Sequence, residues 1–274
     1  MAKDLYQKIV QLRNNGSRAA LATLIARSGA TPRKDSAKML ICEDGSQFGT
    51  IGGGAPESEV YREAVSIIET GKPKLLSFDL NDVDPEESAL VCGGSMEVYV
   101  EPLIPDPVLF VFGAGHVGKA VADAVASIGF RIAVIDDRPK YANSERFPFA
   151  DSLYVDHWEK IFTKLNVNTF SYLFIATRDH RFDLLCLRFA LKSSAAYIGM
   201  LGSRKKSASL FNQLEKEGFD TTDFERVFVP AGLDVGSETP EEIAASIAAE
   251  LIAVRKKLDI QSLKSAWRAA KALQ

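Results

Sequence analysis

The chain has 274 residues, of which 46 % are apolar and 25 % charged, and a formal net charge of −3. This composition is typical of a soluble globular protein, and the length is sufficient for two domains that each bury a core. The acidic balance argues against nucleic acid as a partner. The sequence shows no secretion signal and no apolar run of the roughly twenty residues that span a membrane, which predicts a cytoplasmic protein without a membrane partner.

Residues 1–105 predict an α+β domain, smaller than the part that follows. Asp44 and Gly45 are a hairpin signal, and Pro56 suits the first turn of a helix. The apolar spacing predicts strands at Ala19 to Ala26, Lys38 to Cys42, Gln47 to Ile51, Lys74 to Phe78 and Met96 to Val100, and helices at Asp4 to Arg13 and Glu57 to Glu69.

Three successive glycines, Gly52, Gly53 and Gly54, interrupt this domain. They cannot support a regular strand, so they form either a tight turn or a loop where a ligand approaches the backbone.

A second glycine-rich stretch organises the rest of the chain. The apolar run from Val108 to Phe112 predicts a buried strand, and Gly113, Gly115 and Gly118 follow at G-x-G-x-x-G spacing. In this fingerprint the first glycine allows the tight turn, the second lets a pyrophosphate approach, and the third lets the helix pack on the strand. His116 lies within the turn and either donates to a bound phosphate or caps its helix.

Strands and helices alternate from here on, which predicts a Rossmann-like, doubly wound parallel sheet over residues 106–258. Residues 259–274, rich in Ala, Lys and Leu, predict a helical tail. The predicted strands are Arg131 to Ile135, Leu153 to Val155, Tyr172 to Ala176, Ala195 to Met200 and Arg226 to Val229, and the helices are His116 to Ser127, Trp158 to Leu165, Phe182 to Lys192, Arg204 to Glu217 and Pro240 to Leu258.

Ligands of such sheets bind outside the carboxyl ends of the strands, and polar residues follow several of these ends. Asp136 and Asp137 lie about twenty residues after the glycine fingerprint, where an acidic side chain can accept hydrogen bonds from ribose hydroxyls. Gly202, Ser203 and Arg204 lie at the start of a predicted helix, and the positive end of a helix favours a bound anion. Arg178 and His180 occupy a charged turn, where His180 is either a ligand-binding or catalytic group or a solvated side chain.

The three cysteines, Cys42, Cys92 and Cys186, are too far apart for a disulfide framework or a four-cysteine zinc site, so we expect no metal site of the protein's own. Cys92 precedes two glycines, so a ligand can approach its sulfur, which either contacts a metal or labile sulfur or packs as a small apolar group. Cys42 and Cys186 lie in apolar runs and are expected in the core.

Eight motifs carry a family resemblance: Gly29 to Arg33, Gly49 to Gly54, Cys92 to Ser95, Phe112 to Gly118, Asp136 to Pro139, Thr177 to His180, Tyr197 to Arg204 and Gly232 to Ala244. With these motifs in this order, the chain to about Leu258 resembles the XdhC/CoxI family, the accessory proteins for maturation of xanthine dehydrogenase and related molybdenum hydroxylases. The resemblance implies an amino-terminal domain of residues 1–105 joined to a Rossmann domain. It also implies binding of the molybdenum cofactor, as molybdopterin or its dinucleotide form, and its protected delivery to an apo molybdenum hydroxylase.

We therefore expect a cofactor-insertion chaperone rather than a catalyst, a homodimer, and a cysteine desulfurase as a further partner. The alternative is an NAD(P)-dependent oxidoreductase that uses the same fingerprint with Asp136 on a ribose. A Rossmann domain used only for protein interaction would leave the loops at the strand ends without a role.

Overall fold

The computed structural model describes residues 5–28, 37–79 and 94–258, without the side chain of Arg204. The chain divides into two compact units, Met1–Pro105 and Asp106–Gln274. Cys92 and the predicted helical tail, 259–274, lie outside the described residues.

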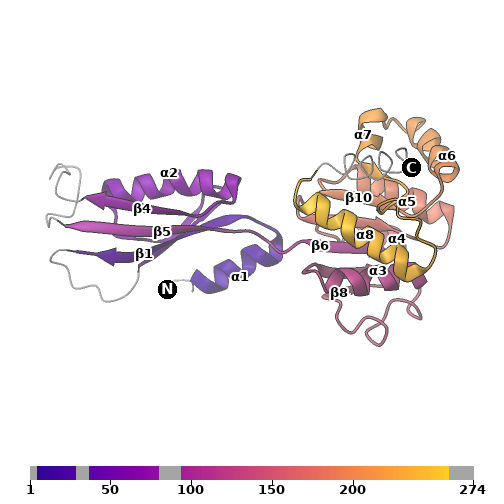
Figure 1. The fold of residues 1–274 in the computed structure, drawn as a ribbon, viewed down its shortest axis with the longest axis horizontal. Coiled ribbons are helices and arrows are strands. Elements are labelled where there is room, and N and C mark those ends of the chain that lie inside the picture. The colour runs from indigo at the N-terminus through magenta and orange to yellow at the C-terminus, as the bar shows by residue number, and fades with distance from the viewer. Residues whose placement is uncertain (1–4, 29–36, 80–93, 259–274) are drawn as a thin grey trace, which may run out of the picture. The chain divides into compact units, whose positions relative to one another are not determined.

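The first unit is an antiparallel sheet with a helix on each face. Its strands follow the order β3-β2-β1-β5-β4, and α2 lies along one face (Figure 1). Helix α1 packs on the opposite face, where its Leu12 meets Leu40. The elements are α1 (Leu5–Asn15), β1 (Ala19–Arg27), β2 (Lys38–Cys42), β3 (Gln47–Gly49), α2 (Gly54–Thr70), β4 (Lys74–Asp79) and β5 (Ser95–Leu103).

The second unit is a parallel sheet in the order β11-β10-β9-β6-β7-β8. In chain order this is 6-5-4-1-2-3, the strand order of dinucleotide-binding sheets. The elements are β6 (Val108–Phe112), α3 (His116–Ala126), β7 (Arg131–Ile135), β8 (Ser152–Tyr154), α4 (Trp158–Phe162), β9 (Ser171–Ile175), α5 (His180–Leu191), β10 (Tyr197–Met200), α6 (Arg204–Glu215), α7 (Thr221–Glu225), β11 (Val227–Phe228) and α8 (Pro240–Arg255).

The central strand β6 shows why helices cover both faces of this sheet. Its side chains alternate, so Leu109 and Val111 join the core under α3 and α8, while Phe110 and Phe112 join the core under α4, α5 and α6. Both faces are therefore buried, which requires the continuous apolar run seen in the sequence. Figure 1 shows α8 and α3 together on one side of the sheet.

The predicted fold class is confirmed, and the differences are shifted ends of elements and one additional helix. β3 ends at Gly49 rather than Ile51, and α5 begins at His180 because the Asp179 side chain caps it by accepting from the backbone N–H of Arg181 at 2.8 Å. Helix α7, with only five residues, is absent from the prediction. Its signal is the reciprocal capping of Asp220 and Asp223, which the apolar periodicity does not reveal.

Candidate functional site

The candidate site lies at the carboxyl end of the parallel sheet. The chain leaves β6 toward β7 on one side, and β9 follows on the other side, so the strand order reverses between β6 and β9. Ligands of doubly wound sheets bind at this point.

Each glycine of the turn after β6 has a different physical reason to be glycine. Gly113 has a φ of 110°, and a Cβ on it would overlap the carbonyl oxygen of Ala176. A Cβ on Gly118 would overlap the carbonyl oxygen of Gly113, so this glycine lets α3 pack on β6. Gly115 has an ordinary φ of −70°, and a Cβ there would meet no protein atom within 4 Å. The fold therefore needs Gly113 and Gly118, while Gly115 leaves space open beside the start of α3, at the position where turns with this fingerprint admit a phosphate.

A buried carboxylate holds this turn in place. Asp136, with a side chain only 2 % exposed, accepts a hydrogen bond from the backbone N–H of Ala114 at 2.9 Å. It also accepts from the Arg138 guanidinium at 2.7 and 2.8 Å and from the Arg138 backbone at 3.1 Å. Burial alone would raise the pKa of Asp136, but the bonds from Arg138 and Ala114 outweigh it and lower this pKa. Both carboxylate oxygens are used inside the protein, so the ribose contact proposed for Asp136 has no oxygen left to accept it in this arrangement.

The neighbouring acid, Asp137, lies in a more exposed ion pair. Arg178 donates to both of its oxygens, at 2.7 and 2.9 Å, and the two side chains are 38 % and 20 % exposed. Asp137 follows β7 and Arg178 follows β9, on either side of β6, so the pair joins the two sides of the switch point. A surface pair of this kind is worth about 1 kcal/mol or less, so an anionic ligand can compete for Arg178 at little cost.

The remaining predicted residues of this unit lie at helix starts. His116 and His180 are exposed and begin α3 and α5. His116 does not cap α3, whose cap residue is Gly115. Ser203 caps α6 by accepting from the backbone N–H of Lys206, and Lys206 packs over Gly202. Arg204 is the first residue of α6.

The glycine loop of the first unit has a different environment. Gly52, Gly53 and Gly54 all have positive φ, at 133°, 82° and 74°. The Glu57 carboxylate accepts from the backbone N–H groups of Ile51 and Gly53 at 3.1 and 3.0 Å and from the Thr50 hydroxyl at 2.5 Å. Burial alone would raise the pKa of Glu57, but these bonds outweigh it and lower the pKa. An internal carboxylate thus occupies two of the backbone donors of this loop, those of Ile51 and Gly53, that an external anion would need.

The two described cysteines are core residues, as predicted. Cys42 is 3 % exposed and Cys186 is fully buried. Burial raises the pKa of both thiols, that of Cys186 well above its ordinary value, which lowers their reactivity. The role assigned to Cys92 stays a prediction, because this residue lies outside the described part.

Two further residues that shape the site, Arg146 and Glu250, were not predicted. Arg146 donates to the carbonyl oxygen of Ala114 at 2.8 Å, directly behind the glycine turn. Glu250, fully buried on α8, accepts from the Tyr197 hydroxyl at 2.7 Å and from the backbone N–H of Gly232 at 2.9 Å, and so fixes the loop after β11. Their partners are distant in sequence, which is why local patterns do not reveal them.

Within 5–28, 37–79 and 94–258, no group of three or more His, Cys, Asp and Glu side chains could hold a metal ion. No helix in these ranges is long and apolar enough to cross a membrane.

The glycine roles predict losses of stability of different size for two similar substitutions. Gly118→Ala should lower the free energy of unfolding by about 2 kcal/mol, because its Cβ forces β6 and α3 apart. Gly115→Ala should lower it by less than about 1 kcal/mol, because the methyl group meets no protein atom. Urea unfolding of both variants measures the difference, and equal losses would contradict the separate roles.

The lowered pKa of Asp136 predicts a pH signature. Asp136→Asn should cost about 3 kcal/mol at pH 7, since it leaves Arg138 and Ala114 without a carboxylate. A carboxyl group whose pKa is lower in the folded than in the unfolded state stabilises the fold at a pH above its unfolded-state pKa of about 3.9. This stabilisation is lost as the pH falls through the folded-state pKa. The difference between parent and variant should therefore be constant from pH 7 to 5 and narrow below pH 4. Asp137→Asn is the control, with a smaller loss.

Comparisons with known proteins place the chain. A family model described as the XdhC Rossmann domain matches residues 109–251, and a model described as the XdhC and CoxI family matches residues 12–79. A xanthine dehydrogenase from Bacillus halodurans has a similar crystal structure, with a TM-score of 0.52 and 22 % identity over 92 % of this chain and 96 % of that one. At this identity the likeness shows the fold alone.

Three curated relatives are also similar. Uncharacterized protein YqeB of Escherichia coli is 32 % identical over 92 % of this chain and 46 % of its own length. A probable subunit of xanthine dehydrogenase from Bacillus subtilis is 31 % identical over 60 % of this chain and 47 % of its own length. The chain thus spans about half the length of these two. The molybdenum cofactor insertion chaperone PaoD of Escherichia coli is 23 % identical over 88 % of this chain and 85 % of its own length. Since the Rossmann model alone covers more than half of its residues, the chain belongs to the XdhC and CoxI family.

Proposed function

We propose that this protein binds the molybdenum cofactor and delivers it to an apo molybdenum hydroxylase of the xanthine dehydrogenase type. The observation that carries the proposal is the open space at Gly115, in a turn whose other glycines are fixed by packing. Two relatives are named as a cofactor insertion chaperone and as a probable subunit of xanthine dehydrogenase, and these names support this choice of ligand and partner.

The described residues fit the phosphate end of such a cofactor. Backbone N–H groups at the start of α3 and the guanidinium of Arg178 are the groups that would hold phosphate. The cofactor, when bound, supplies the molybdenum and its dithiolene sulfurs. The protein's part is to bind and orient it at the switch point and to limit its exposure to water. A cysteine desulfurase as the sulfur source and a homodimer as the working assembly belong to the same proposal.

The test compares the parent protein with Gly115→Val, purified from the same molybdenum-replete cells. Branched carbons at this position fill the space of the phosphate, whereas strand β6 before it is unaffected. After oxidation, the parent should release a fluorescent pterin in near-stoichiometric amount, and the variant should release less than a tenth as much. Thermal unfolding checks that the variant is folded.

NAD(H) and NADP(H) titrations by calorimetry on the same two preparations test the oxidoreductase alternative. Saturable dinucleotide binding that Gly115→Val abolishes, in a parent protein without pterin, would replace the chaperone proposal. A parent protein that carries no pterin and binds no dinucleotide would contradict both the chaperone proposal and the oxidoreductase alternative.

Cys92 is proposed to contact the metal or labile sulfur of the cofactor. Cys92→Ser should leave the protein folded but slow the activation of an apo-hydroxylase at least tenfold in a reconstitution assay. Cys42→Ser and Cys186→Ser are the controls, and they should lower stability more than transfer, because both sulfurs are buried. Activation by Cys92→Ser at the parental rate would show that Cys92 has no part in transfer.

A further inference from the structure

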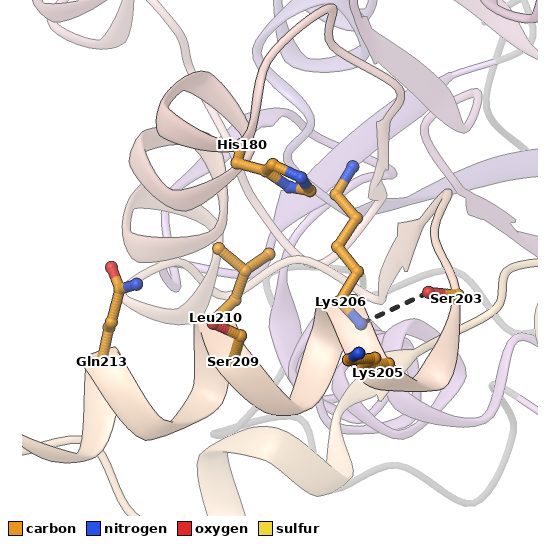
Figure 2. Close-up of a pocket in the computed structure, with 7 residues that line it drawn as sticks. All are labelled: His180, Ser203, Lys205, Lys206, Ser209, Leu210 and Gln213. Atoms are coloured by element: carbon orange, nitrogen blue, oxygen red, sulfur yellow. Dashed lines mark hydrogen bonds between the residues drawn. The ribbon is translucent and has the colours of Figure 1, made fainter.

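A cavity of about 530 Å³ lies along α6, from its cap residue Ser203 to Gln213, beside His180 at the start of α5. His180 comes from α5, and the other lining side chains come from Ser203 and α6 (Figure 2). The volume is within the range of small-molecule sites. The described residues that line this cavity all belong to the second unit, and none of them is a glycine of the turn after β6.

The first turn of α6 has an unusual charge. This turn begins with Arg204, Lys205 and Lys206, and it contains no acidic residue. A helix start is the positive end of the dipole, where acids stabilise and cations destabilise. Helices α4, α5, α7 and α8 follow this rule with at least one acid in the first turn, whereas α3, which begins at the phosphate-binding turn, has none. α6 therefore shares with α3, and with α1 of the first unit, the absence of an acid in the first turn.

One of the two lysines is fixed by a buried partner. The Lys206 ammonium lies 2.6 Å from Oδ2 of Asp183, whose side chain is 1 % exposed. Oδ1 of Asp183 accepts from the Thr177 hydroxyl at 2.6 Å. The charge of Lys206 is thus balanced, and its aliphatic part lies against Gly202.

The other lysine leaves the cavity with excess positive charge. Lys205 is exposed and forms no ion pair with an acid among the described residues, and no carboxylate is among the residues that line the cavity there. The start of α6 adds its partial positive charge, whereas the start of α5 carries the acids Asp179 and Asp183. The arrangement is locally unfavourable without an anion, and a bound anion would compensate it.

The rest of the lining suits an organic group. Leu210 supplies an apolar surface, and Ser209 and Gln213 supply a hydroxyl and an amide on α6, opposite His180 (Figure 2). An apolar surface with a few polar groups beside a cationic end is typical of sites for phosphorylated small molecules.

We propose that this cavity binds a phosphate monoester, with the phosphate at the start of α6 beside Lys205 and the organic part over Leu210. It is a second anion site of this unit, separate from the turn at Gly115. The proposal stands on the cavity and its charges and does not rest on the molybdenum cofactor.

The test uses the full chain with Gly115→Val as background, so that the glycine turn cannot bind the probe. Calorimetry measures ribose 5-phosphate and inorganic phosphate. The ester should bind more tightly than inorganic phosphate, Lys205→Glu should weaken its binding at least tenfold, and Lys216→Glu, at the other end of α6, should change it less than twofold. Without phosphate, Lys205→Glu should raise Tm by about 1–3 °C, because an acid suits the helix start.

The combination of higher Tm and weaker binding is the result a merely structural lysine would not give. Equal weakening by Lys205→Glu and Lys216→Glu would overturn the proposal in favour of non-specific charge. Loss of all ester binding in the Gly115→Val background would assign the phosphate to the turn instead. Binding of inorganic phosphate as tight as that of the ester would overturn the assignment to an organic ligand.

Discussion

The arrangement of the second unit depends on the carboxylate of Asp136. It lies at the end of β7, almost fully buried, and bonds to the backbone of Ala114 in the middle of the glycine turn after β6. Arg138 neutralises it, and without this partner a buried charge of that kind would be costly. Asp136 and Arg146 bond to the backbone N–H and carbonyl of Ala114 and so fix the turn. A ligand could therefore enter the open space at Gly115 without a rearrangement of the turn. Such preorganisation lowers the cost of ordering a loop when a ligand binds.

A carboxylate that bonds to a neighbouring loop also occurs at two other places in the chain. Glu57 binds the backbone of the loop at Gly52 to Gly54, and Asp183 binds Thr177, whose backbone lies against Gly113. In each case a carboxylate a few residues or one strand away satisfies donors that a regular element would otherwise satisfy. The consequence differs between them. In the loop at Gly52 to Gly54 the carboxylate of Glu57 takes the N–H group of Gly53 itself, whereas Asp136 bonds to Ala114, which precedes the start of α3.

Most of the fold could be predicted because its signals are local. The strand from Val108 to Phe112, the glycine spacing after it and the alternation to Arg255 each depend on residues close together in the sequence. The roles of the acids could not be predicted in this way. Asp136 stands at the offset of a ribose-binding acid, but whether its oxygens face a ligand or the protein is decided by Arg138 and by burial. Likewise the sequence shows Lys205 and Lys206 side by side, and only the packing of α5 on the sheet shows that Asp183 balances one of them.

The net charge of the chain is negative, whereas the exposed side chains Arg178 and Lys205 near the strand ends are positive. The chain carries −3 overall, so its long-range field does not attract anions. The exposed cations that face the strand ends, Arg178 and Lys205, therefore act at short range, together with the backbone at the starts of α3 and α6. Screening by salt reduces such contacts less than it reduces long-range steering, because they act well within a Debye length of about 8 Å. We therefore expect the geometry of the strand ends to select any anionic ligand of this unit, and its rate of association to depend only weakly on ionic strength.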